Sequence, residues 1–458
     1  MHSIFTKNFG IFNAKNFESY STGTNSNTYI AIGRQVSWAN GDVTPDPVDT
    51  ANTFYDVWDN LIGMKKLNAS DMNLVVPRVD WQSDTLYVEY NQDTELFYKA
   101  NTANVAYDNK FYVRNTNDQV FKCLYNNRSN NSTVMPEISI DGQLPENPYI
   151  VTSDGYKWKY LYTIPAGLKE KFFTSEFMPI ISEPIVTNSA TDGRLDIIKI
   201  IDDGAGFNAN SNSNSYTILT VSGDGSDANL TAIVTTTDAD GANLVGYNII
   251  SGGNNYTRAT ISVNDALKIP NTANANLIAV IGPPGGHGAN VEQELGASSL
   301  MICGQIIGSE SGVLPINSAN SQYRQIALLR NPKLEANSEY AYGTVYRLTD
   351  KYVLTTPNRD FVDGETVYVG TSLSSATFTG LVESYDSTSH YLYLNNTTGS
   401  VAAPATIYGN TTGATATILS IEESDIKKFS GELLYIENEP QIIRSSIETQ
   451  QIKLTLRF

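Results

Sequence analysis

The sequence is poor in charged residues, in histidine and in cysteine. Only 17% of its 458 residues are Asp, Glu, Lys or Arg, whereas about 25% is usual for a globular protein. Three histidines (His2, His287 and His390) lie far apart, and the two cysteines, Cys123 and Cys303, can form one disulfide at most. These shortages exclude a disulfide framework. We also expect no zinc site, no Ser-His-Asp catalytic triad and no cofactor.

Basic residues are also scarce. The 30 Lys and Arg against 48 Asp and Glu give a net charge of −18, which disfavours binding to nucleic acid and to anionic membrane surfaces. No stretch approaches the roughly 18 apolar residues of a membrane-spanning helix, and the first residues, MHSIFTKNFGIFNAKNF, lack the pattern of a signal peptide. We therefore expect a soluble, unsecreted protein that binds no nucleic acid and does not insert into a membrane.

Aromatic residues are abundant by contrast, with 27 Tyr and 16 Phe. Disordered chains are poor in aromatic residues, so this composition predicts a folded protein. The length suggests two to four domains. Short aromatic or β-branched runs, bounded by Asn, Asp, Gly or Pro, predict strands at 28–32, 85–90, 110–113, 120–125 and 157–164. The predicted fold class is mainly β with a few short helices (α+β).

Two helices are predicted near the start of the chain. The longer one follows a capping residue, Asp49 or Thr50, has apolar side chains at helical spacing from Phe54 onward, and ends near Lys66. A shorter one is predicted to begin at Asn13. The remaining elements are expected to be strands and turns.

The stretch 186–290 is rich in Gly, Asn, Ser, Thr and Ala and contains an internal repeat. The motif ANLTA (228–232) recurs as ANLIA (275–279), and Gly206 recurs as Gly253, both at an offset of 47 residues. Two copies are too few for a solenoid. The repeat therefore predicts a β module with two-fold internal similarity, in which each copy contributes three strands.

A second repeat lies in 351–421. The motif TVY (366–368) recurs as TIY (406–408) at an offset of 40 residues, which predicts a small β barrel or sandwich. The two modules would be insertions in a discontinuous, β-sandwich-like core. The predicted segments are core 1–185, inserted module 186–290, core 291–350, inserted module 351–421 and C-terminal core strands 422–458.

Few sequence features suggest catalysis. The stretch GPPGGHG (282–288) lacks the Lys-Ser/Thr of a phosphate-binding loop, so we interpret it as a rigid turn, with His287 as a turn residue. Acidic clusters at 202–203, 238–240 and 422–425 are typical of turns and solvated surfaces. A glycosidase that acts through a pair of these carboxylates is the remaining enzymatic hypothesis, because sequence does not give the distance between carboxylates on which that chemistry depends.

Tryptophan and tyrosine clusters are the most informative local features. Trp38, Trp81 and Trp158 each lie in a dense aromatic or apolar segment, and Arg34 and Arg78 lie beside two of them. Buried aromatic residues anchor cores, whereas Trp, Tyr and Arg are enriched at interface hot spots. Both interpretations stay open for the candidate anchors: Arg34, Trp38, Arg78, Trp81, Trp158, Tyr160, Tyr435 and Asn438.

Six segments, in order along the chain, resemble the baseplate wedge subunit of T-even-type, contractile-tailed bacteriophages. The similarity covers about 1–185, 291–350 and 422–458, and leaves out the two repeat-bearing stretches. The segments are IGRQVSW (32–38), VVPRVDW (75–81), FKCLY (121–125), SDGYKWKYLYTIP (153–165), YRQIALLRNP (323–332) and SGELLYIENEPQII (430–443), the last followed by QIKLTLRF at the C-terminus.

The resemblance implies a virion structural protein without enzymatic activity. It implies a β-rich homodimer, assembled in the host cytoplasm, that joins other wedge subunits of the tail baseplate, including those linked to short tail fibres. It also implies participation in the rearrangement of the baseplate during infection. The alternative is a tail protein that binds carbohydrate or a receptor on the host surface through the two inserted modules.

Overall fold

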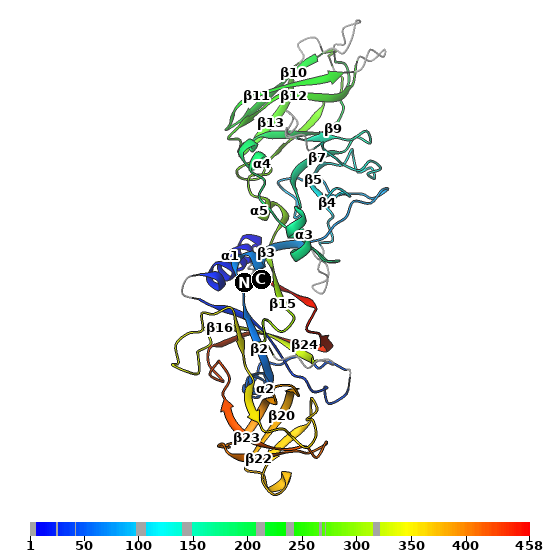
Figure 1. Cartoon of the computed structure of the whole chain (residues 1–458). Coiled ribbons are helices and arrows are strands. Elements are labelled where there is room, and N and C mark those ends of the chain that lie inside the picture. The colour runs from blue at the N-terminus through cyan, green and yellow to red at the C-terminus, as the bar shows by residue number, and fades with distance from the viewer. Residues whose placement is uncertain are drawn as a thin grey trace. The chain divides into compact units, whose positions relative to one another are not determined.

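The computed structural model describes residues 6–23, 26–41, 43–97, 107–139, 149–207, 216–234, 242–264, 268–270, 272–314 and 321–458. The chain forms two compact units. Unit 1 comprises 1–14, 74–299 and 457–458, and unit 2 comprises 15–73 and 300–456. Both units are built mainly from β-strands with a few short helices, so the predicted fold class is confirmed (Figure 1). The predicted module 186–290 thus belongs to unit 1, and the predicted module 351–421 to unit 2.

The first sheet of unit 1 carries the aromatic segments. Its strand order is β4-β5-β7-β6, and the pairing of β5 with β7 places Phe121 opposite Tyr160 and Cys123 opposite Trp158. Both strands are almost fully buried because aromatic and apolar side chains occupy both faces. The elements are β4 (Tyr112–Arg114), β5 (Gln119–Tyr125), β6 (Ile150–Val151), β7 (Lys157–Thr163), α3 (Ala166–Phe172), β8 (Phe177–Pro179) and α4 (Pro184–Ser189).

The repeat-bearing stretch forms a second group of strands in unit 1. Its strands are β9 (Leu195–Asp202), β10 (Tyr216–Gly223), β11 (Ser226–Val234), β12 (Leu244–Asn254), β13 (Ala259–Asn264) and β14 (Asn276–Ile281), and α5 (Val291–Leu295) follows. The first strand of each copy pairs with the third strand of the other copy, as β9 with β14 and β12 with β11. The second strands, β10 and β13, pair with each other. A separate apolar core, which includes Leu195, Leu230 and Leu277, fills this module.

In the six-stranded barrel of unit 2, the first strand of each repeat copy again pairs with the third strand of the other copy, as β18 with β23 and β21 with β20. The barrel is closed in the order β18-β21-β20-β19-β22-β23. The repeated motifs are neighbours, since Tyr368 pairs with Tyr408 and their rings stack with centroids 5.5 Å apart. The strands are β18 (Asp350–Leu354), β19 (Thr366–Val369), β20 (Phe378–Asp386), β21 (Tyr391–Gly399), β22 (Ala405–Gly409) and β23 (Thr415–Glu422), with a 3-10 turn η2 (Leu373–Ser375) (Figure 1).

A five-stranded sheet forms the remainder of unit 2, in the order β17-β2-β1-β16-β24. Long β24 lies at its edge, and β25 is a neighbour of β15. Cys303 of β15 and Cys123 of β5 are both buried and are not joined in a disulfide. The elements are β1 (Thr28–Gly33), α2 (Ala51–Asn60), β2 (Leu61–Lys66), η1 (Ala69–Asp71), β15 (Ser299–Ile307), β16 (Ser321–Arg330), β17 (Val345–Arg347), β24 (Glu432–Arg444) and β25 (Thr449–Arg457); α1 (Lys7–Thr22) and β3 (Met72–Pro77) continue from one unit into the other.

Three local predictions need correction. Thr50 caps α2 by accepting a hydrogen bond from the Thr53 amide at 3.2 Å, as expected, but the helix ends at Asn60. The next residues form β2, because pairing with β1 buries them in the sheet. The predicted strand 85–90 is irregular, since its amides bond to scattered partners, among them the carbonyls of Lys110 and Cys123. The first helix begins at Lys7, earlier than predicted.

Candidate interaction sites

Three of the predicted anchors meet in one aromatic cluster of unit 1. Trp158 and Tyr160 are buried in β7, and half-buried Trp81 packs against the same cluster. The Trp158 ring stacks on Tyr156 with centroids 5.3 Å apart. The indole Nε1 of Trp81 donates to Ser132 Oγ at 3.1 Å. Trp158 and Tyr160 therefore lie in the core, whereas Trp81 is partly buried at the edge of the cluster.

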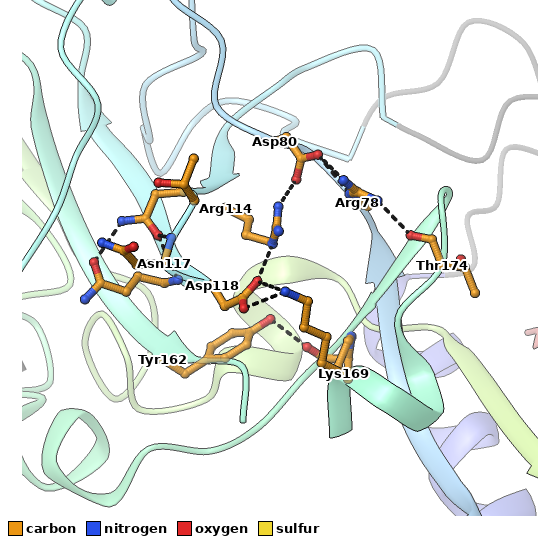
Figure 2. Close-up of polar contacts among 12 residues, drawn as sticks. Arg78, Asp80, Arg114, Asn117, Asp118, Tyr162, Lys169 and Thr174 are labelled. Atoms are coloured by element: carbon orange, nitrogen blue, oxygen red, sulfur yellow. Dashed lines mark hydrogen bonds and ion pairs between the residues drawn. The ribbon is translucent and has the colours of Figure 1, made fainter. Parts of the chain in front are cut away.

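Arg78 belongs to a chain of ion pairs rather than to that cluster (Figure 2). Arg78 Nη2 and Arg114 Nη1 each lie 2.5 Å from a different oxygen of Asp80. Arg114 Nε continues to Asp118 Oδ1 at 2.9 Å, and Lys169 Nζ completes the chain at 2.7 Å from Asp118 Oδ2. Three cations thus share two carboxylates, which leaves one net positive charge in a protein of net charge −18. We call these five residues the Arg78 network.

An aromatic ring and the local turns hold the Arg78 network in place. Phe173, at the end of α3, lies under all three cations, with the Arg78 and Arg114 guanidinium carbons 4.5 and 4.8 Å from the ring centroid. Burial alone would raise the pKa of Asp80, but hydrogen bonds from the two arginines outweigh it and lower that pKa. The members are 12–40% exposed, so the network can still contact a partner.

Four other anchors meet beside the edge strand β24 of unit 2. The Arg34 guanidinium lies 4.2 Å from the centroid of the Trp38 ring. Trp38 Nε1 donates to the Glu439 carbonyl at 2.9 Å, and Asn438 Nδ2 donates to the Pro45 carbonyl at 2.9 Å. Two segments about 400 residues apart in the chain are fastened together in this way. The fourth anchor, Tyr435, lies three residues before Asn438 in the same strand.

An exposed apolar patch adjoins these anchors. Its core is an edge-to-face contact between Tyr55 and Phe429, with ring centroids 5.3 Å apart. A groove of about 320 Å³, lined in part by Val48, Leu434 and Tyr435, continues the patch along β24. Burial raises the pKa of Tyr435 to about 12. We call this surface the β24 patch; its most exposed members are Val48 (59%), Tyr55 (52%), Phe429 (43%) and Leu434 (37%).

Sequence reasoning identified Tyr435 of the β24 patch as a candidate anchor but missed the other members of the patch. A signal was present for one of them. Phe54 and Trp58 set the inward face of α2, so Tyr55, the next residue after Phe54, must point outward. An outward aromatic residue on a short helix is a reason to suspect an interface. The position of Phe429 depends on the fold and had no such signal.

Two of the acidic clusters of the sequence have ion-pair or hydrogen-bond partners in the structure. Asp203 pairs with Arg128, and Glu422 pairs with Lys351, both at 2.9 Å. Asp425 accepts a hydrogen bond from the Arg347 amide at 2.8 Å. The cluster at 238–240 lies outside the described residues. Nothing within the described ranges gathers three or more His, Cys, Asp or Glu side chains into a group that could hold a metal ion.

Sequence reasoning also missed a buried ionic cluster in unit 1. Lys122 Nζ of β5 lies 2.9 Å from Glu294 Oε2 of α5, and the two side chains are 2% and 3% exposed. His287 Nδ1 lies 2.8 Å from the same carboxylate oxygen, and the Gly288 amide donates to the other. Burial lowers the pKa of His287, which keeps the imidazole neutral at pH 7. His287 lies in a turn, as predicted, but its side chain is buried, which the sequence did not indicate.

A second buried acid, Glu383, lies in β20 of the barrel. Neither of its carboxylate oxygens has a hydrogen-bond partner among the described residues, and the residue is fully buried. Burial raises the pKa of Glu383 well above its usual range, and nearby Asp363 adds to this effect while Arg444 opposes it. A neutral carboxyl group is therefore the form that this interior favours.

No helix in the described ranges combines the length and the hydropathy needed to cross a membrane. No protein-family model and no curated protein matches the chain.

Proposed function

We propose that the chain is a structural subunit of a phage tail baseplate wedge, without enzymatic activity. In this role it forms a homodimer in the virion and assembles with other wedge subunits, including those linked to short tail fibres. It takes part in the rearrangement of the baseplate during infection. The charge of −18 would keep the free subunit soluble in the host cytoplasm and attract basic surfaces on its partners.

The arrangement of the resembling segments carries this proposal. The IGRQVSW segment begins within the last two residues of β1, and its Ile32 pairs with Ile326 of the YRQIALLRNP segment in β16. That strand pairs in turn with the SGELLYIENEPQII segment, where Ala327 faces Ile436. FKCLY and SDGYKWKYLYTIP are likewise neighbouring strands, β5 and β7. Five of the six segments thus lie in two hydrogen-bonded sheets, three segments in unit 2 and two in unit 1, and this supports a common structural origin more strongly than scattered matches would.

The β24 patch supports assembly through a protein interface. Strand β24 is at the edge of its sheet, and edge strands present unpaired backbone groups that can bind another chain. Exposed apolar side chains adjoin this edge, rimmed by polar residues such as Asp49 and Glu432. Such patches mark interaction surfaces. A second copy of the chain is the occupant that we assign to it.

Sedimentation of the purified chain at micromolar concentration tests this assignment. We expect a dimer for the natural sequence and a monomer for Leu434→Asp, because a carboxylate buried in an interface would lose its hydration. Leu419→Asp is the matched control: Leu419 is 56% exposed on β23 and belongs neither to the lining of the groove nor to the Tyr55–Phe429 contact. A strict monomer, or equal effects of the two substitutions, would contradict the dimer. Failure to co-assemble with the other wedge subunits of the same phage would contradict the wedge role.

A further inference from the structure

Unit 1 contains a cavity that the proposed structural role does not require. Its volume is about 420 Å³, within the range of about 300–1,000 Å³ that is usual for small-molecule sites. It lies between the segment from Tyr90 to Phe97, the turn at Pro283 and Pro284, and helix α5. Exposed Gln92 and Gln293 stand at its rim, so the cavity is open to solvent.

The floor of the cavity is polar but carries no net charge. It contains Lys122 and Glu294, whose opposite charges lie 2.9 Å apart. His287 is hydrogen-bonded to Glu294 at 2.8 Å, and because it is neutral it adds no charge to the floor. A cation would be repelled by the Lys122 ammonium. An anion would meet the exposed carboxylate of Glu95 at the rim as well as the negative field of the whole protein.

Hydrogen-bonding groups of the cavity remain unused. Tyr90 is 8% exposed and lines the cavity, yet its hydroxyl makes no hydrogen bond to a described residue. Lys122 Nζ, which donates to Glu294 at 2.9 Å, also lies 4.4 Å from the centroid of the Tyr90 ring and holds that ring at the cavity. The Gln293 side-chain amide has no partner there either, while Asn290 uses only its oxygen, to accept from the Gln293 backbone amide at 3.0 Å. Donors and acceptors thus point to a ligand that offers both.

The walls supply apolar surface beside these polar groups. Phe97, Leu96, Pro283 and Pro284 line the cavity. The Phe97 ring is held by edge contacts with Tyr107 and Phe111, whose centroids both lie 5.4 Å away. A rigid aromatic ring and proline rings bind C–H groups well, and a few placed polar groups then fix the orientation of the ligand.

We propose that this cavity binds a neutral saccharide of one or two rings. Such a molecule presents hydroxyl groups, which both donate and accept, together with apolar C–H faces, and carries no charge. This chemistry matches the uncharged floor, the unused hydroxyl and amide groups, and the apolar walls. The site takes Pro283, Pro284 and Asn290 from the end of the stretch 186–290 but lies outside the strands β9 to β14 of that module, and it does not depend on the wedge role.

Saturation-transfer NMR on the full-length chain tests the proposal. The probes are glucose, galactose, N-acetylglucosamine, maltose and lactose, with glucuronic acid and inorganic phosphate as charged comparisons. We expect at least one neutral sugar to bind in the millimolar range or tighter. Tyr90→Phe removes only the hydroxyl and Gln293→Ala only an exposed amide, and each should weaken binding about three- to tenfold.

Gln82→Ala is the matched control, since Gln82 is an exposed amide of unit 1 that does not line the cavity. It should leave sugar binding unchanged, and circular dichroism should give all three variants the melting temperature of the natural chain within a few degrees. Absence of binding by every neutral probe would overturn the proposal. So would binding that the Tyr90 and Gln293 substitutions leave unchanged, or tighter binding of phosphate or glucuronic acid than of any neutral sugar.

Discussion

Replacing Lys122 by Met should destabilise unit 1 strongly. The substitution removes one partner of an ion pair whose side chains are 2% and 3% exposed, and leaves the Glu294 carboxylate without its nearest cation. Breaking a buried pair in this way costs about 3–5 kcal/mol. Bulk salt should screen the pair little, because both side chains are almost fully buried.

The titration of Glu294 gives a second measure of the same effect. Burial alone would raise the pKa of Glu294, but Lys122 and His287 outweigh it and lower that pKa from 4.5 to about 2. At 1.36 kcal/mol per pH unit, this difference corresponds to about 3 kcal/mol. Because the folded pKa is the lower one, this stability is fully present above pH 4.5 and is lost as the pH falls toward 2.

His287 acts in the same direction. Its folded pKa lies below 6.5, so the unfolded chain takes up a proton below that pH that the folded chain does not. Acidification from pH 7 should therefore weaken unit 1 in two stages, first below 6.5 and then below 4.5. In Lys122→Met the second stage should shrink, because the main group that depresses the Glu294 pKa is gone.

The two buried thiols provide an assay for each unit separately. Cys123 lies in β5 beside Lys122, and Cys303 lies in unit 2. Thiol labelling along a urea gradient, read by mass spectrometry, should show a lower midpoint for Cys123 in Lys122→Met and an unchanged midpoint for Cys303. Lys122→Met with Glu294→Gln should recover part of the loss. A loss below about 1 kcal/mol for Lys122→Met, or an equal shift at both thiols, would refute the reasoning.

Three further predictions concern other buried or clustered groups. Because the folded pKa of Glu383 is raised, its contribution to stability is fully present below pH 4.5 and is lost as the pH rises. Glu383→Gln should therefore be more stable than the natural chain at pH 8, by at least about 1 kcal/mol. Equal stability of the two proteins in urea at pH 8 would contradict this. Trp158→Ala should cost about 3–5 kcal/mol by chemical denaturation, and Trp81→Ala less, because Trp81 is only partly buried. The reverse order would contradict the core assignment. Arg114→Met removes two ion pairs of the Arg78 network and should cost only about 1–2 kcal/mol, because the network is partly exposed; a loss above 3 kcal/mol in the same measurement would show that the network acts as a buried one.

Local patterns predicted the elements that depend on neighbouring residues. The cap at Thr50, the strands around Tyr29, Phe121 and Trp158, and the β-rich fold class all follow from short-range chemistry. The end of α2 did not, because Leu61 is apolar in either a helix or a strand, and only pairing with β1 decides between them. The irregular segment at Tyr87 has strand-like composition, but its amides bond elsewhere.

Distance along the chain limits what sequence can show about the sites. The repeats were visible as matched motifs, but the exchange of strands between copies was not. Lys122 and Glu294 lie 172 residues apart, and neither stands out where it occurs in the sequence. Trp38 was visible as an anchor, whereas its bond to the Glu439 carbonyl connects segments that only the fold brings together.

The proposed wedge role is tested most directly by electron cryomicroscopy of contractile tails, purified from the phage that this proposal makes the source of the chain. The account predicts density for both units of the chain in each baseplate wedge, with a second copy against the β24 patch. Purified tails without this density, and without peptides of the chain by mass spectrometry, would contradict the account.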